Sequence, residues 1–149
     1  MKKIFSLLIL LSLANCSGIL KHKSYLLLVQ ESKNATFDGK VLQLNNVAKS
    51  TIYFSSKPER IAGHVSNVTL AKYWNSKKHH KSFKKDATIS YYDNKGKADI
   101  ATLELSNYKV KTNSVSYEAK VVKGKLPKNV DNVTLIIDKA KCHRSICAY

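Results

Sequence analysis

The sequence predicts an all-β domain, mainly antiparallel, folded as a sandwich or barrel of about seven strands with one short helix. Short runs rich in β-branched and aromatic residues recur along the chain, and turn-forming residues separate them. No segment between these runs has the long helical periodicity that the crossovers of a parallel sheet require. The chain has 149 residues and shows no internal repeat or linker. It is therefore expected to fold as one domain around a single core.

Seven runs have the residue pattern of strands. They are residues 25–29, 41–44, 51–54, 87–92, 98–105, 114–122 and 132–138. The tetrapeptide Asp93-Asn94-Lys95-Gly96 lies between two of these runs. Because Asn and Gly tolerate positive φ, this tetrapeptide predicts a hairpin turn.

One segment, from Ser66 to Trp74, has helical character instead. Ser66 or Asn67 can cap the helix. The apolar residues that fall on one face at helical spacing are Val68, Leu70, Ala71 and Trp74. A short helix with this face toward the core is expected.

The N-terminus has the pattern of a secretory signal peptide over residues 1–15. Lys2 and Lys3 precede the apolar run 4–14, which is too short to span a bilayer, since a spanning helix needs about 20 apolar residues. We expect this segment to be removed from the mature protein.

The stretch Leu13-Ala14-Asn15-Cys16 resembles the lipobox of bacterial lipoproteins. The resemblance implies that Cys16 carries acyl chains such as palmitate and anchors the chain in the membrane of a bacterial cell envelope, in the outer membrane or on a periplasmic face. Residues 16–23 would then form a lipidated tether, and residues 24–149 a single β-rich domain. Asn15 departs from the Gly, Ala or Ser of the pattern, so ordinary cleavage to a secreted or soluble periplasmic protein is the alternative.

Two cysteines remain near the C-terminus, Cys142 and Cys147. In an oxidising compartment this pair predicts a disulfide, which would close a small loop and have a modest effect on stability. Free thiols are the second reading. A metal site with His143 is the third, but a structural zinc site needs four ligands.

Residues 50–64 combine an aromatic strand, a polar turn and the sequence Pro58-Glu59-Arg60. They resemble a segment of uncharacterised secreted β-rich bacterial proteins, over a region that reaches about residues 40–138. The resemblance implies a fold and no activity. Ser56-Lys57 departs from the acidic-basic pair expected before the proline.

This segment allows two interpretations. As a structural corner, Pro58 fixes φ after the strand. As a polar site, Glu59, Arg60 and His64 would lie beside an aromatic wall of Tyr53 and Phe54.

Residues 77–85 form a strongly basic segment that we expect to be an exposed loop. Five lysines could bind an anion, and two histidines could bind a metal, although the neighbouring ammonium groups repel cations. These residues are Lys77, Lys78, Lys81, Lys84 and Lys85, with His79 and His80.

The charge balance indicates an anionic partner. The chain carries 26 basic and 10 acidic side chains, and removal of Lys2 and Lys3 with the signal segment leaves 24 basic ones. Such a field attracts anionic surfaces such as acidic lipid or envelope polymer. Nucleic acid fits the same charge but is not normally present in the envelope.

The sequence therefore predicts a lipid-anchored cell-envelope protein with a basic β-rich binding or structural module. No catalytic motif and no cofactor signature is present, and an enzyme is the less favoured class. The alternative is an envelope enzyme or metal-binding protein with a site near Glu59, Arg60 and His64, or at His79 and His80.

Overall fold

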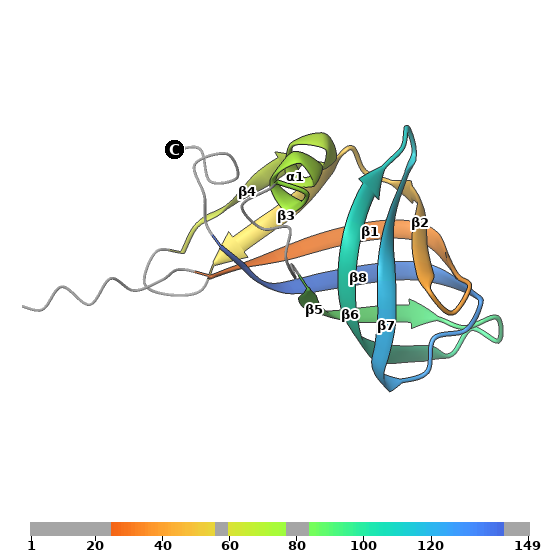
Figure 1. Cartoon of the computed structure of the whole chain (residues 1–149). Helices are drawn as coiled ribbons and strands as arrows, with labels where there is room; N and C mark the ends of the chain where they lie inside the picture. The colour runs from red at the N-terminus through yellow and green to blue at the C-terminus, as the bar shows by residue number, and fades with distance from the viewer. Residues whose placement is uncertain (1–24, 56–59, 77–83, 142–149) are drawn as a thin grey trace, which may run out of the picture.

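The computed structural model describes residues 25–55, 60–76 and 84–141 (Figure 1). These residues form eight strands and one helix, and the mainly antiparallel all-β class is confirmed. The elements are β1 (Tyr25–Phe37), β2 (Val41–Val47), β3 (Ser50–Ser55), β4 (Ala62–Ser66), α1 (Asn67–Trp74), β5 (Lys85–Tyr92), β6 (Ala98–Val110), β7 (Ser114–Gly124) and β8 (Asn129–Lys141).

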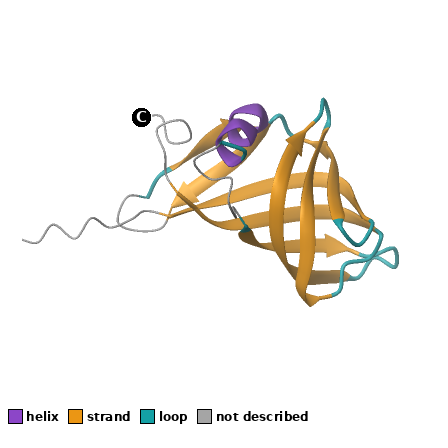
Figure 2. Ribbon diagram, in the orientation of Figure 1, coloured by secondary structure: helices purple, strands orange, loops and turns teal. Residues whose placement is uncertain are grey.

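Six of the strands close into a barrel (Figure 2). Around the barrel the order is β1, β2, β7, β6, β5 and β8, and β8 pairs back to β1. Every pairing is antiparallel. Closure leaves these six strands without a free edge, so their backbone groups bond to one another all around the wall.

β1 belongs to two structures at once. Its second half, from Ser32 to Phe37, pairs with β2 and completes the barrel, whereas Leu26–Val29 pair with β3. β3 and β4 form a hairpin that extends the sheet beyond the barrel (Figure 1). The split in β1 therefore places this hairpin next to one end of the barrel.

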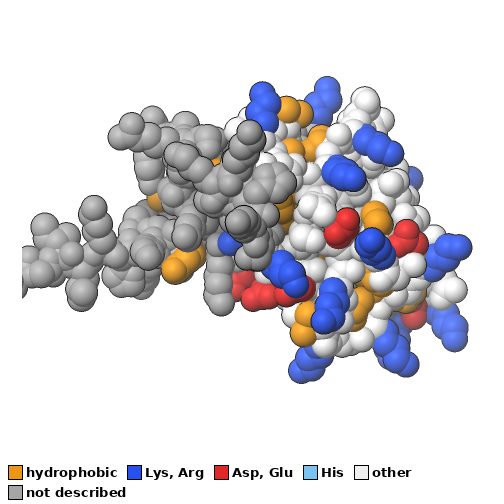
Figure 3. All heavy atoms as spheres, viewed as in Figure 1, with side chains coloured by type: hydrophobic (Ala, Val, Ile, Leu, Met, Phe, Trp, Pro, Cys, Tyr) orange, Lys and Arg blue, Asp and Glu red, His pale blue; other side chains and the backbone are white. Residues whose placement is uncertain are grey.

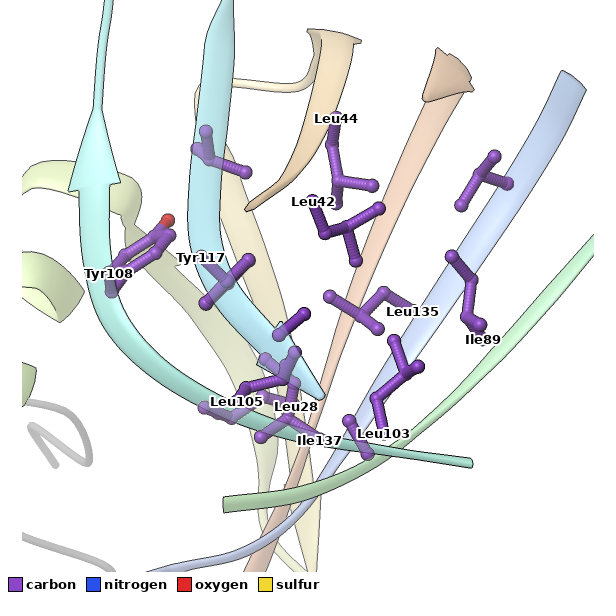
Figure 4. Close-up of a cluster of buried hydrophobic side chains, with 14 of the residues drawn as sticks. Leu28, Leu42, Leu44, Ile89, Leu103, Leu105, Tyr108, Tyr117, Leu135 and Ile137 are labelled. Carbon is purple, nitrogen blue, oxygen red and sulfur yellow. The ribbon is translucent and has the colours of Figure 1, made fainter. Parts of the chain in front are cut away.

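The barrel interior is filled by side chains from all six of its strands (Figure 4). Strand residues alternate between the interior and the surface, as β1 shows with buried Leu26 and Leu28 on either side of half-buried Leu27. The labelled interior residues are Leu28, Leu42, Leu44, Ile89, Leu103, Leu105, Tyr108, Tyr117, Leu135 and Ile137. In the part of the chain that the structure describes, these side chains form a packed core.

Asparagines in the left-handed conformation interrupt two barrel strands. Asn107 in β6 has φ 50° and Asn132 in β8 has φ 47°. The pairing register shifts around both residues, and the alternation of buried side chains changes phase there, from Leu105 to Tyr108 in β6. These are bulges, which bend the strands and so help the sheet to close.

The expected helix is confirmed as α1, but its buried face differs from the prediction. The Ser66 side chain accepts a hydrogen bond from the Thr69 backbone N–H and caps the helix, as predicted. Leu70 and Trp74 are buried, but Val68 is 55% exposed. Asn67 and Tyr73, which the apolar pattern did not select, are buried instead. α1 packs against β6, β3 and β4, between the hairpin and the barrel end (Figure 1).

The predicted turn at Asp93–Gly96 is confirmed as the β5–β6 hairpin. The Gly96 N–H donates to the Asp93 carbonyl oxygen, and Gly96 has φ 72°. The Asp93 carboxylate accepts bonds from the Lys97 and Lys95 backbone N–H groups, the first of which is the largest cause of a lowered pKa at Asp93.

Candidate functional site

A groove of about 1030 Å³ lies where α1 meets the barrel end. We call it the basic groove and define it by its three walls. The first wall is residues 47–49 at the end of β2, and the second is the outer face of α1 with its caps, from Ser66 to Asn75. The third wall is residues 108–115 of the β6–β7 hairpin. The three walls are far apart in sequence and are brought together by barrel closure.

Three hydrogen bonds hold these walls in place, two between backbone groups and one from a side chain. The Val47 N–H donates to the Asn113 carbonyl oxygen, which joins the first wall to the hairpin. The Asn67 N–H donates to the Lys49 carbonyl oxygen at 3.1 Å, which joins the first wall to α1. The side-chain amide of Asn75 donates to the Tyr108 backbone carbonyl oxygen at 2.8 Å and joins α1 to the hairpin. The groove is thus bounded by fixed backbone on each side.

Four lysines line the groove, and all of them are exposed: Lys49, Lys72, Lys109 and Lys111. No Asp or Glu is among the lining residues. None of the four lysines forms an ion pair with a carboxylate in residues 25–55, 60–76 or 84–141. The groove therefore concentrates positive charge that the described chain leaves uncompensated.

Charge alone would not have located this site. Figure 3 shows basic side chains over the whole visible face of the barrel. A second hollow, of about 430 Å³, contains both Lys33 and Glu31 and so has no excess of one sign. The basic groove differs because its lysines surround a concave surface without acidic neighbours.

Beside the lysines, the groove has aliphatic residues as well as the polar residues Thr112, Asn113 and Ser114. Val68 lies on the exposed face of α1, and Ala71 follows it one turn later, half-buried. Val47 and Val110 are half-buried on the other two walls. The groove therefore combines apolar walls with cationic side chains, as small-molecule sites often combine an apolar lining with a few charged groups.

The floor of the groove is connected to a buried polar network. The side-chain oxygen of Asn67, Oδ1, accepts a hydrogen bond from the Thr51 hydroxyl at 2.7 Å. The side-chain nitrogen of Asn67, Nδ2, donates to the Ala48 backbone carbonyl oxygen at 2.7 Å. The Gln30 amide donates to the Thr51 hydroxyl at 2.8 Å and to the Tyr108 hydroxyl at 2.9 Å. These bonds fix the floor from inside the protein.

Two stacked tyrosines complete the network. The rings of Tyr108 and Tyr117 have centroids 4.7 Å apart, and Trp74 of α1 packs against both rings. The Tyr117 hydroxyl donates to the Gln30 carbonyl oxygen at 2.7 Å. Burial raises the pKa of Tyr108 to about 12 and raises that of Tyr117 well above its usual value. Both hydroxyls stay protonated at neutral pH, so they serve as hydrogen-bonding groups rather than as bases.

Lys84 and Lys85, the described part of the lysine segment predicted as an anion site, do not line this groove. Lys77, Lys78 and Lys81 lie outside the described residues, with His79 and His80. Lys84 is exposed, and its Nζ forms an ion pair with Glu104 Oε1 at 2.7 Å. The predicted loop ends earlier than expected, because Lys85 is half-buried and begins β5. The groove lysines were missed because no single stretch of sequence contains them, although the alternation Lys109-Val110-Lys111 beside a turn is a weak signal.

The other predicted site residues are only partly described. Cys16, Cys142, Cys147 and Glu59 lie outside the described residues, as does His143. The lipid anchor and the disulfide therefore stay predictions.

The proposed wall of Tyr53 and Phe54 is wrong, because adjacent strand residues face opposite sides: Tyr53 is 6% exposed and Phe54 is 37% exposed. Arg60 and His64 are exposed, and His64 Nδ1 is 3.4 Å from the Ser50 hydroxyl. In the part of the chain that the structure describes, no three His, Cys, Asp or Glu residues are grouped as metal ligands.

In the same residues, no helix has the length and apolar character that crossing a membrane requires. No family model, curated protein or solved structure matches the chain.

Proposed function

We propose that this chain is a lipid-anchored cell-envelope protein whose β-domain binds an anionic ligand in the basic groove. The observation that carries the binding proposal is the gathering of Lys49, Lys72, Lys109 and Lys111 around one concave surface without a lining carboxylate. The anchor rests on the lipobox resemblance at Cys16.

The residue type in the groove favours recognition of charge over recognition of shape. Lysine presents a flexible, strongly hydrated point charge, whereas arginine presents a planar fork that matches phosphate geometry. The groove contains four lysines and no arginine. Its selectivity is therefore expected to follow the number of negative charges on the ligand, and its affinity to fall as salt screens the exposed ammonium groups.

Inorganic tripolyphosphate is a suitable probe, because it is multiply charged and has no apolar part. We expect the full chain to bind it in isothermal titration calorimetry at low salt and to lose affinity as salt is added. Replacing the four groove lysines with Gln should weaken binding about tenfold or more, since each exposed ion pair contributes a few tenths to about 1 kcal/mol. The groove variant is Lys49→Gln, Lys72→Gln, Lys109→Gln and Lys111→Gln.

A matched control removes the same charge from the far end of the barrel. Lys95 and Lys97 lie in or beside the β5–β6 turn, and Lys123 and Lys125 lie at and just after the end of β7. All four are exposed, and none lines the groove. Their replacement with Gln should weaken tripolyphosphate binding by less than about threefold. Equal weakening in the two variants would mean that the overall field, not the groove, holds the anion.

A further inference from the structure

We propose that the ligand of the basic groove is an anionic amphiphile, with its charged head among the lysines and an alkyl chain along the aliphatic wall. This inference rests on the proposed function and adds the chemical class of the ligand. It depends on three features of the groove: its apolar lining, its saturated floor and its size.

The apolar lining offers contacts that a hydrated anion cannot use. Val68 is 55% exposed although it lies in the first turn of a helix that packs on the barrel. It faces the same groove as Val110 of the β6–β7 hairpin and Val47 of β2. A single exposed valine is ordinary, but Val68 together with the half-buried Val47 and Val110 gives one concave surface apolar side chains from three elements, which an alkyl chain would cover.

The polar groups of the floor are already engaged. Asn67 uses its carbonyl oxygen for Thr51 and its amide for Ala48. The Tyr108 carbonyl oxygen accepts from Asn75, and its hydroxyl accepts from Gln30. A sugar polymer would need unoccupied donors and acceptors at this floor, whereas an alkyl chain needs none. The floor therefore favours an alkyl chain over a carbohydrate as the occupant of the groove.

The size and the lysine stems fit the same occupant. A volume of about 1030 Å³ is at the upper end of small-ligand sites, which span roughly 300–1,000 Å³. Lysine side chains can lay their methylene stems along an apolar surface and keep the ammonium group in water. Lys72 on α1 and Lys109 on β6 can thus extend the apolar contact and still bind the head group.

A homologous series of alkyl phosphates tests the inference. Butyl, hexyl, octyl and decyl phosphate carry the same head group, and each is titrated into the full chain below its micelle concentration. The Kd should fall about two- to fourfold for each added CH₂, the range expected for partial to full burial of that group. A Kd that stays within about twofold from butyl to decyl phosphate overturns the inference, and tripolyphosphate binding then shows whether the anion site itself survives.

Two variants test where the alkyl chain of the ligand lies. Val68→Ser combined with Val110→Ser should reduce the gain between butyl and decyl phosphate about fivefold or more. The far-UV circular dichroism spectrum of the variant, compared with that of the parent, shows whether the variant is folded. Val122→Ser is the control, because Val122 is 63% exposed on β7 and does not line the groove. A full chain-length gain in the groove variant, or an equal loss in the control, would overturn the placement.

The same head and chain occur in free amphiphiles and in bilayer lipids, and a displacement experiment separates the two sources. Vesicles of phosphatidylglycerol are added to the chain loaded with decyl phosphate. Vesicles of phosphatidylcholine, which can only extract decyl phosphate by partition, are the control. Displacement by the anionic vesicles beyond this level identifies a lipid taken from a bilayer, and no displacement beyond it identifies a free amphiphile. Sedimentation with phosphatidylglycerol vesicles that is undiminished in the groove lysine variant would place the lipid outside the groove and contradict the proposal.

Discussion

Gln30 is the residue around which the barrel end is organised. Its side chain is 1% exposed, and its amide group bonds to Thr51, Tyr108 and Tyr117, which come from three other strands. A buried amide without partners would cost several kcal/mol, so its placement depends on all three hydroxyls. The network therefore fixes the groove floor and β1 together.

The two tyrosines of this network should ionise at a higher pH than an ordinary tyrosine. Their pKa values are raised by burial, that of Tyr108 to about 12, whereas a tyrosine in the unfolded chain ionises near 10. Above pH 10 the folded protein therefore holds protons that the unfolded chain has lost. The stability from these protonated hydroxyls is complete below pH 10 and is lost as the pH rises towards 12.

Tyrosinate absorbance of the full chain against pH measures this directly. Part of the absorbance change of the eight tyrosines should occur well above pH 10, and Tyr108→Phe should reduce that part. One phase near pH 10, unaltered by Tyr108→Phe, would show that the two hydroxyls are not buried as described.

At the scale of single strands, asparagines determine where the barrel bends. Asn132 has φ 47° at the point where the pairing of β8 with β5 shifts register. Non-glycine residues pay about 1–2 kcal/mol in this region, and Asn tolerates it better than most. Asn132 therefore has a structural role, which is to adopt the positive φ that the bulge requires.

Asn132 can be tested by paired substitutions. Asn132→Gly should leave the free energy of unfolding within about 0.5 kcal/mol, whereas Asn132→Ala should lower it by about 1 kcal/mol, because Ala resists positive φ. Asn129→Ala, at the start of the same strand, should be neutral because Asn129 does not have positive φ. Urea unfolding measures all three variants. Equal stability of the Ala and Gly variants at position 132 would show that the bulge is not strained for Ala.

A strand or helix could be predicted from the sequence when its signal lies in neighbouring residues. The strands rich in β-branched residues and the Ser66-capped helix were predicted, because propensity and capping are properties of neighbouring residues. β4 was missed because Ala62–Ser66 contains small and polar residues. It is a strand because β3 pairs with it, with Tyr53 opposite Gly63. A Cβ on Gly63 would lie 2.5 Å from the Tyr53 hydroxyl, so the tyrosine ring fills the place of a side chain.

The groove could not be predicted, because its parts come from three distant segments. Lys49, Lys72 and Lys109 are neighbours only after β2, α1 and β6 have been assembled. The sequence instead predicted an anion site in residues 77–85, where the lysines lie close together along the chain. Local density of charge is visible in a sequence, whereas concavity is a property of the folded chain.

At the scale of the whole molecule, the proposed anchor limits where the groove can act. Eight residues lie between Cys16 and Tyr25, and the nine residue steps that join the two span about 30 Å when the chain is fully extended. A domain held at this distance would stay within about three to four Debye lengths of the bilayer surface, where the Debye length is ~8 Å. Because salt largely screens exposed charges beyond one Debye length, the positive field of the domain would reach ligands at the membrane only when the tether is not fully extended.

Metabolic labelling with an alkyne analogue of palmitate tests the anchor. The parent chain should incorporate the label, and Cys16→Ala should lose it, because the thiol is the acylated group. Cys142→Ala controls for loss of a cysteine and should be labelled like the parent. Undiminished labelling of the Cys16→Ala chain would rule out acylation at this residue.

The central claim is that the basic groove, and not the charge of the whole surface, binds the anion. The most direct measurement is backbone amide chemical-shift mapping of the full chain during titration with tripolyphosphate. We expect shifts that saturate together and are concentrated in residues 47–49, 66–75 and 108–115, the three walls of the groove. Shifts of similar size at lysines over the whole surface, including Lys95, Lys97, Lys123 and Lys125 at the far end of the barrel, would contradict it.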